Sequence, residues 1–260
     1  MQVVFDRARK LRQRDDAAAA AQREADYLKD EVAARLADRL LDIKGRVFAD
    51  ALDVGAGPGF LARHLDSALV RRLTMLDSSR KMLTRDADSA TPQSQTSAQS
   101  PIQLQLQQLH LQTNDTDSNT DTIPITAVCA DEEFLPFAND SFDAVFSSMA
   151  LHWVNDLPGV LRQITNILKP DGLFLAAMPG GDSLFELRSS LQLAETERTG
   201  GVSPRVSPMA TMRDLGALLS RAGMTLTTVD SDEIVVGYPS MYELIEDLRS
   251  MGEQNASIHR

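Results

Sequence analysis

Residues 51–60, ALDVGAGPGF, place three glycines directly after a short apolar segment. This pattern is typical of a buried β-strand that runs into a nucleotide-binding turn. A dinucleotide-binding G-x-G-x-x-G sequence would need glycine at position 60, which is Phe60, and the Gly-Lys-Ser/Thr of a phosphate-binding loop is absent. The turn therefore disfavours pyrophosphate, while its glycines still let the backbone approach a ligand closely.

Strand-like and helix-like segments alternate from Phe48 to Met178, which favours a parallel sheet covered by helices on both faces. We expect strands at ALDV, RRLTMLD, ITAVCAD, FDAVFSSMAL and GLFLAAM, and helices at GFLARHLDSAL, SRKMLTRDAD and DLPGVLRQITNIL. Beyond them, MRDLGALLSRAG and SMYELIEDLRSMG predict helices, and LTTVDSDEIVVGY is consistent with two closing strands. The fold class predicted is α/β: a doubly wound, seven-stranded, Rossmann-like sheet with an N-terminal helix and a C-terminal helical lid.

The pattern divides the chain into three parts. Residues 1–44 form an N-terminal helical segment, residues 45–180 the sheet core, and residues 181–260 a lid or substrate segment with the closing strands. Residues 89–122, rich in Gln, Ser, Thr, Asn and Asp, are interpreted as a low-complexity surface insertion in the core. The first fourteen residues carry five bases and one acid, similar to an organelle presequence, but we interpret them as part of the mature protein.

Charge and cysteine content exclude several classes of function. The net charge is −11, and the stretch from Asp86 to Leu161 holds eleven acids and no Lys or Arg. Nucleic-acid binding is disfavoured, because neutralising phosphates requires a basic face. The single cysteine, Cys129, excludes an internal disulfide and is expected to be inert in the core of the third strand.

Acids follow the next two predicted strands. Asp77 ends the second strand, 20 residues beyond Gly57, where a carboxylate can accept both hydroxyls of a ribose. Asp131 and Glu132 follow the third strand and reach the same edge, where a carboxylate can accept an adenine amino hydrogen. Adenosine without phosphates, next to a cationic sulfonium, suits such an acidic pocket, so we predict S-adenosylmethionine (SAM) as the cofactor.

The predicted cofactor-binding residues lie at the ends of the first four strands: Asp53, Gly55, Ala56, Gly57, Gly59, Asp77, Ser78, Asp131, Glu132, Ser147 and Met149. His152 is a candidate catalytic residue, or alternatively a helix-start histidine bonded to backbone. Trp153, the only tryptophan, is either a substrate platform or a packing anchor. Asp182 and Glu186 are further catalytic candidates that could clasp a cationic arginine, or else solvated surface acids.

Further motifs support a resemblance to known families. LPFANDSFDAV and LKPDG, with the glycine turn, resemble class I SAM-dependent methyltransferases over residues 48–178. Outside that region, FDRARKLRQRDDAA, LHWVNDLPGVLRQI, GGDSLFELRSSLQLAETERTGG and DEIVVGYPSMYELIEDLRSMGE resemble the mitochondrial complex I assembly factor 5 family, described as arginine hydroxylases. That family typically continues beyond NASIHR, so we expect this chain to be C-terminally truncated relative to it.

The resemblance implies a SAM-binding protein of the mitochondrial matrix, at the matrix face of the inner membrane. It also implies hydroxylation of an arginine of an iron–sulfur subunit of the complex I peripheral arm, together with other assembly factors. Hydroxylation needs activated oxygen, yet the four histidines include no pair with metal-ligand spacing, so no metal site is predicted. Two alternatives stay open: a SAM-dependent methyltransferase acting on a small-molecule or protein carboxylate or arginine, and a non-catalytic SAM-binding assembly chaperone.

Overall fold

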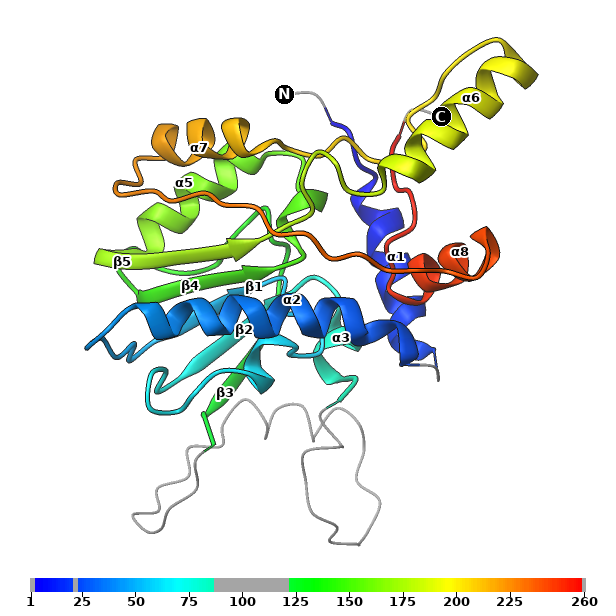
Figure 1. Cartoon of the computed structure of the whole chain (residues 1–260). Helices are drawn as coiled ribbons and strands as arrows, with labels where there is room; N and C mark the ends of the chain where they lie inside the picture. The colour runs from blue at the N-terminus through cyan, green and yellow to red at the C-terminus, as the bar shows by residue number, and fades with distance from the viewer. Residues whose placement is uncertain (1–2, 21–22, 87–121, 259–260) are drawn as a thin grey trace, which may run out of the picture.

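The computed structural model describes residues 3–20, 23–86 and 122–258, and the described strands form one sheet of five parallel strands (Figure 1). The strand order is β3-β2-β1-β4-β5, and every pairing is parallel. The strands are β1 (Ala51–Val54), β2 (Leu73–Asp77), β3 (Ile125–Cys129), β4 (Phe142–Ser148) and β5 (Leu168–Ala177). The order reverses between β1 and β4, which places a topological switch point at the carboxyl end of β1.

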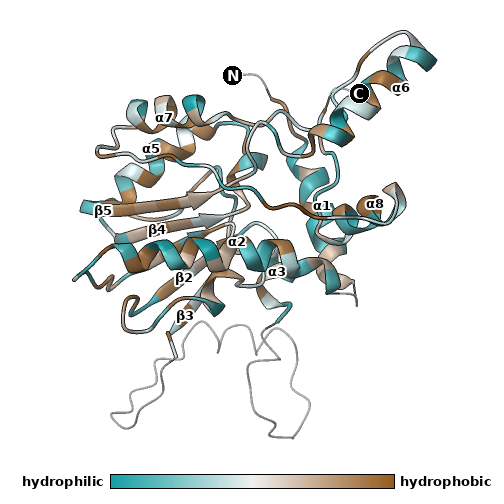
Figure 2. Cartoon of the chain, viewed as in Figure 1, coloured by the Kyte–Doolittle hydropathy of each residue, from teal (hydrophilic) through white to brown (hydrophobic). Residues whose placement is uncertain are grey.

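Helices cover both faces of the sheet, which confirms the predicted α/β class. On one face α2 (Tyr27–Asp38) and the 3-10 turn η3 (Leu61–Arg63) pack on β1, β2 and β4. On the other face α5 (Leu157–Ile167) and α7 (Met212–Arg221) pack on the alternate residues of the same strands. The strands and the inward sides of these helices are mostly apolar in Figure 2, so burying them against one another forms the core.

Several of the remaining elements lie toward the carboxyl ends of the strands. The remaining described elements are α1 (Arg7–Ala19), η1 (Glu24–Asp26), η2 (Arg39–Asp42), α3 (Arg80–Thr84), η5 (Leu151–Trp153), α6 (Phe185–Thr199) and α8 (Met241–Ser250). Asp6 caps the start of helix α1, because its carboxylate accepts a hydrogen bond from the Arg9 backbone N–H at 2.9 Å. Figure 1 shows α1 and α8 beside that end of the sheet, and α6 projecting away from the body.

The prediction of a sixth and a seventh strand is wrong. Among the described residues the sheet has five strands, and residues 224–238 contain none. The acids of this segment pair instead with the bases of the α2 region. Arg35 bonds Asp232 at 2.5 Å and Arg39 bonds Asp230 at 2.9 Å. These two ion pairs, both exposed, connect the segment to the α2 region.

Two local predictions also need correction. The helix expected at residues 59–69 is only the single turn η3, because the Asp66 carboxylate accepts from the Ala68 N–H at 2.7 Å and competes with helix formation. Cys129, expected in the core, is exposed, since among the described strands β3 lies at the edge of the sheet and pairs only with β2. The insertion at 89–122 lies almost wholly outside the described residues. No helix among the described residues is long and apolar enough to span a membrane.

Candidate functional site: an acidic strand edge covered by helix α1

The glycine turn after β1 has the close approach that its sequence predicted. Gly55 and Gly57 have φ angles of +74° and +59°, in the left-handed region that glycine tolerates best. A Cβ atom at Gly55 would lie 2.1 Å from the Cβ of Ala150, which follows β4. The turn therefore needs glycine both for its backbone angles and for its contact with the neighbouring loop.

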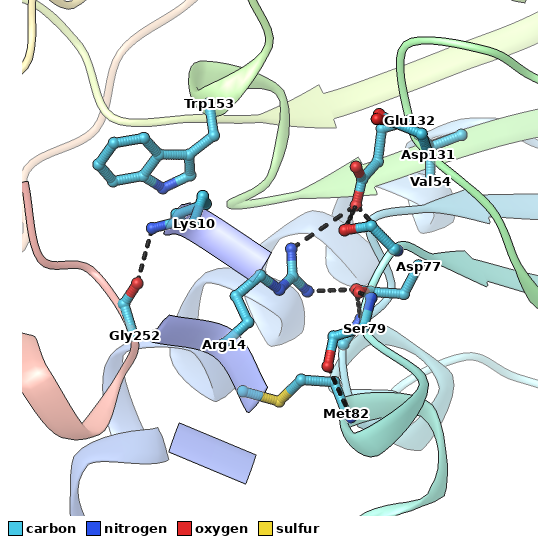
Figure 3. Close-up of polar contacts among 12 residues, drawn as sticks. Lys10, Arg14, Val54, Asp77, Ser79, Met82, Asp131, Glu132, Trp153 and Gly252 are labelled. Atoms are coloured by element: carbon cyan, nitrogen blue, oxygen red, sulfur yellow. Dashed lines mark hydrogen bonds and ion pairs between the residues drawn. The ribbon is translucent and has the colours of Figure 1, made fainter. Parts of the chain in front are cut away.

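Asp77 ends β2 directly beside this turn and is fully buried. Its carboxylate accepts hydrogen bonds from the backbone N–H groups of Gly57 and Ser79, each at 2.8 Å. The guanidinium of Arg14 forms an ion pair with the same carboxylate (Figure 3). The position expected to receive a ribose thus holds a carboxylate of the right kind, and a side chain of α1 occupies it.

Asp131 and Glu132 follow β3 and meet a second base from α1. Arg7 donates to Asp131 at 2.6 Å and also bonds the Glu132 carboxylate. Ser78 donates to the second Glu132 oxygen from its hydroxyl at 3.1 Å. Burial would raise the pKa of Glu132, but the charges of Arg14 and Arg7 outweigh it and lower that pKa. The acids at the two strand ends are therefore brought together, as predicted, and neutralised by the chain itself.

Asp53 is the buried acid of β1, and in the described part of the chain neither of its carboxylate oxygens has a hydrogen-bond partner. Burial, and then the nearby charge of Asp77, raises its pKa from 3.8 to about 7. It lines a cavity of only about 20 Å³ together with Gly57, Met149 and Arg14. These unpartnered oxygens fit a ligand that brings a cation or hydrogen-bond donors, although a cavity of this volume is too small for a nucleoside.

The other predicted cofactor residues divide between the cavity and its supports. Gly55, Ala56 and Met149 line the cavity, and so does Ser148. Ser147 is buried and its hydroxyl donates to the carbonyl of Val54 at 2.8 Å, which ties β4 to β1. Gly59 has a φ of +89° and supports the turn without lining the cavity.

The residues after β4 form a second cluster, centred on Glu253 from the segment after α8. The Glu253 carboxylate accepts from Trp153 Nε1 at 2.6 Å and lies 3.2 Å from His152 Nε2. Lys29 and Lys10 also pair with it, at 2.8 and 3.4 Å. Burial lowers the pKa of His152, which favours the neutral imidazole.

Lys10 lies between Glu253 and the face of Trp153. Its ammonium is 3.3 Å from the centre of the Trp153 ring and donates to the carbonyl of Gly252 at 2.6 Å (Figure 3). The side chain is only 3% exposed, and burial lowers the pKa of the ammonium well below its usual value. An aromatic face, a carboxylate and a carbonyl therefore surround a cation that burial disfavours.

The remaining catalytic candidates lie elsewhere. Asp182 and Glu186 are exposed near the start of α6, the helix that Figure 1 shows projecting from the body. The structure does not bring them into the cavity or into the Glu253 cluster. Within the described residues, no group of three or more His, Cys, Asp and Glu side chains is arranged to hold a metal ion.

Comparisons with known proteins show the family to which this fold belongs. Residues 52–176 match the methyltransferase domain family. Over 258 residues the chain is 47% identical to the mouse protein "Arginine-hydroxylase NDUFAF5, mitochondrial", covering 99% of this chain and 66% of the mouse protein. The zebrafish (Danio rerio) protein of the same name is 45% identical, with 70% of its length covered. The chain belongs to the arginine-hydroxylase NDUFAF5 family.

The wider relationships of this family member are with methyltransferases. A malonyl-[acyl-carrier protein] O-methyltransferase of Laribacter hongkongensis is 32% identical over 94% of this chain and 73% of its own length. The same fold occurs in a solved complex of the Haloferax volcanii Trm112 methyltransferase activator with a putative methyltransferase. The matching chain has a TM-score of 0.53 at 18% identity, and the match covers 92% of this chain and 93% of that one. The chain spans about two thirds of the mouse relative's length.

The sequence of this NDUFAF5 family member did not predict that bases of α1 pair with the strand-end acids, or that Glu253 centres the second cluster. Arg7, Lys10 and Arg14 are spaced by three and four residues, which places them on one helix face. That spacing is visible in the sequence, but the basic start of the chain, although similar to a presequence, was interpreted only as part of the mature protein. Glu253 follows α8, 100 residues beyond Trp153, and no local pattern connects the two.

Proposed function

We propose that this chain binds SAM at the carboxyl edge of β1, β2 and β3 and hydroxylates an arginine side chain of a protein. The observation that carries the proposal is the 45–47% identity, along 99% of the chain, to proteins named arginine hydroxylases. The acidic strand edge supports the cofactor, because its carboxylates match the donors of an adenosine. The proposed setting is the mitochondrial matrix at the inner membrane.

The proposed target is an arginine of an iron–sulfur subunit in the peripheral arm of complex I, modified during assembly together with other assembly factors. Hydroxylation replaces a C–H bond of arginine with C–OH. With dioxygen as the oxidant, a two-electron reductant and two protons must convert the second oxygen atom to water. The protein's own contribution is to bind and orient the arginine and to exclude water from it.

The residues of the strand edge fit the cofactor by their chemistry. Asp77, held by two backbone N–H groups, would accept the ribose hydroxyls, and Glu132 would face the adenine. Asp53, with its unpartnered oxygens, would accept donors from the remainder of the molecule. When bound, SAM supplies an electrophilic methyl group on a sulfonium centre. Arg14 must leave Asp77 for this binding to occur.

Methyl transfer is the second candidate, and the similarity to a malonyl-[acyl-carrier protein] O-methyltransferase favours it. It requires little of the protein beyond alignment of a nucleophile with the sulfonium and a nearby base. His152, kept neutral by burial, is a suitable base if its unpartnered Nδ1 reaches the acceptor.

Mass spectrometry of the target subunit from cells lacking this protein separates the candidates. Loss of a +16 Da form of an arginine peptide supports hydroxylation, and loss of a +14 Da form supports methylation. An unmodified peptide in both cell lines, with complex I unassembled in the deletion, identifies an assembly chaperone and refutes both enzymes. Calorimetric titration of SAM into Asp77→Asn tests the cofactor site: affinity equal to that of the wild type would refute the ribose assignment.

A further inference from the structure

We propose that the Trp153 ring, the Glu253 carboxylate and the Gly252 carbonyl form the subsite for the guanidinium group of the substrate, here called the guanidinium cage. Lys10 of α1 occupies this cage in the structure as an internal stand-in for the substrate. The assignment rests on the proposed function for the identity of the substrate, arginine, and on the geometry for its position.

The cage has the three features that bind a guanidinium. The indole face attracts a cation within about 6 Å of its centre, and Lys10 Nζ lies at 3.3 Å. The Glu253 carboxylate supplies a charged acceptor, fixed by a 2.6 Å hydrogen bond from Trp153 Nε1. The Gly252 carbonyl supplies a neutral acceptor, at 2.6 Å from the ammonium. A planar group with five N–H donors can stack on the ring and still reach both acceptors.

Arginine suits this position better than the lysine that fills it. Lys10 is almost fully buried, and burial lowers the pKa of its ammonium well below the usual value. A guanidinium stays charged in proteins, is more weakly hydrated than an ammonium, and stacks on aromatic rings. Exchange of Lys10 for a substrate arginine keeps one cation at Glu253, while Lys29 remains its second partner at 2.8 Å. The exchange therefore leaves no buried carboxylate unpaired.

The cage lies beside the proposed cofactor position. Lys29, which bonds Glu253 and also the carbonyl of Met251, lines the same cavity as Asp53 and the glycine turn. A guanidinium in the cage would thus sit next to the cavity that SAM would enlarge. His152, with Nε2 at 3.2 Å from Glu253, is a further titratable side chain beside the cage.

Helix α1 connects the two positions. Lys10 and Arg14 are four residues apart and so share one face of the helix, with Lys10 in the cage and Arg14 on Asp77 (Figure 3). Withdrawal of α1 would open the cage and the ribose position together. The same helix thus fills both positions with its own cations until ligands replace them.

The test uses the full chain and the fluorescence of Trp153, which reports on the cage directly because it is the only tryptophan. N-acetyl-L-arginine amide is titrated into the wild type and into Lys10→Met. N-acetyl-L-citrulline amide, which has the same shape without the charge, is the ligand control. Lys44→Met, at an exposed lysine, is the matched protein control. We expect Lys10→Met to bind the arginine amide at least tenfold more tightly than the wild type and Lys44→Met, with no saturable response to citrulline.

Equal dissociation constants for wild type and folded Lys10→Met, or equal responses to arginine and citrulline, would overturn the proposal. If Lys10→Met does not fold, Glu253→Gln replaces it, and there the arginine amide must bind at least tenfold more weakly than to the wild type. Unchanged binding in that variant also overturns the cage. No oxidant or SAM is present in these titrations. Arginine binding without any +16 Da product in cells would therefore refute the hydroxylase and leave the cage standing, and the reverse result would refute only the cage.

Discussion

Replacing Asp53 with asparagine should change the pH dependence of stability in a defined way. Burial raises the pKa of Asp53 from 3.8 to about 7 in the folded chain. The folded protein therefore binds the proton more tightly than the unfolded chain does, so stability falls as pH rises between these two values. A difference of about 3 pKa units corresponds to a destabilisation of roughly 4 kcal/mol once Asp53 is ionised in both states.

The measurable part lies between pH 5 and pH 8. At pH 5 the Asp53 carboxyl is already largely ionised in the unfolded chain, so part of the destabilisation is present. Raising the pH from 5 to 8 should lower the free energy of unfolding by about a further 3 kcal/mol. Asparagine does not titrate, so Asp53→Asn should lack this loss. The difference between wild type and variant in the free energy of unfolding should therefore grow with pH.

Urea unfolding at pH 5, 6, 7 and 8 measures this difference, and comparison of the two proteins cancels the titration of all other groups. Asp140→Asn, at an exposed aspartate, is the control and should follow the wild type at every pH. Parallel stability curves for wild type and Asp53→Asn would refute the reasoning, because they would mean that Asp53 titrates alike in the folded and unfolded chains.

Two further substitutions test the turn and its cover. Arg14→Met should destabilise the ligand-free protein by about 3 kcal/mol, because it leaves Asp77 buried without its cation. It should also tighten SAM binding measured by calorimetry. Weaker SAM binding would contradict the proposal that Arg14 and SAM compete for Asp77. Gly55→Ala should prevent stable folding or lower the melting temperature strongly, because its Cβ would meet Ala150 at 2.1 Å at a positive φ. Gly180→Ala, with no atom within 4 Å of its added Cβ, is the matched control, and an equal loss in both would contradict this argument.

The residues at the strand ends could be predicted because the geometry of a parallel sheet is regular. Once β1, β2 and β3 run side by side, their carboxyl ends share one edge, and Asp77 and Glu132 must lie close together. The glycine turn was equally readable, since its spacing excluded two of the common phosphate-binding patterns. Local periodicity therefore predicted the acids of the site and the parallel core that positions them.

The closing strands and the partners of those acids could not be predicted in the same way. The apolar alternation near Val235 indicated a strand, but in the structure Asp230 and Asp232 form ion pairs with arginines of the α2 region. Choices of this kind depend on which distant side chains are within reach, and no window of sequence contains both partners. The same holds for Glu253, whose ion-pair and hydrogen-bond partners come from α1, α2 and η5.

The basic face of α1 pairs with some of the acids that are concentrated at the strand ends. Two acids of the stretch from Asp86 to Leu161, Asp131 and Glu132, bind Arg7 of that helix. A buried carboxylate cluster without cations would be strongly destabilising, so a ligand-free chain needs a substitute for the charge and donors of its ligand. Helix α1 supplies them from within the chain.

This substitution implies a coupling between cofactor and substrate that can be measured. If SAM displaces Arg14 from Asp77, the helix that also holds Lys10 in the guanidinium cage is loosened, and part of the free energy needed to empty the cage has been supplied. Linkage makes the effect reciprocal: SAM should tighten the binding of N-acetyl-L-arginine amide by the same factor as the amide tightens SAM. In Lys10→Met the cage is already empty, so the factor should fall toward one. An equally large factor in wild type and variant would show that the coupling does not run through α1.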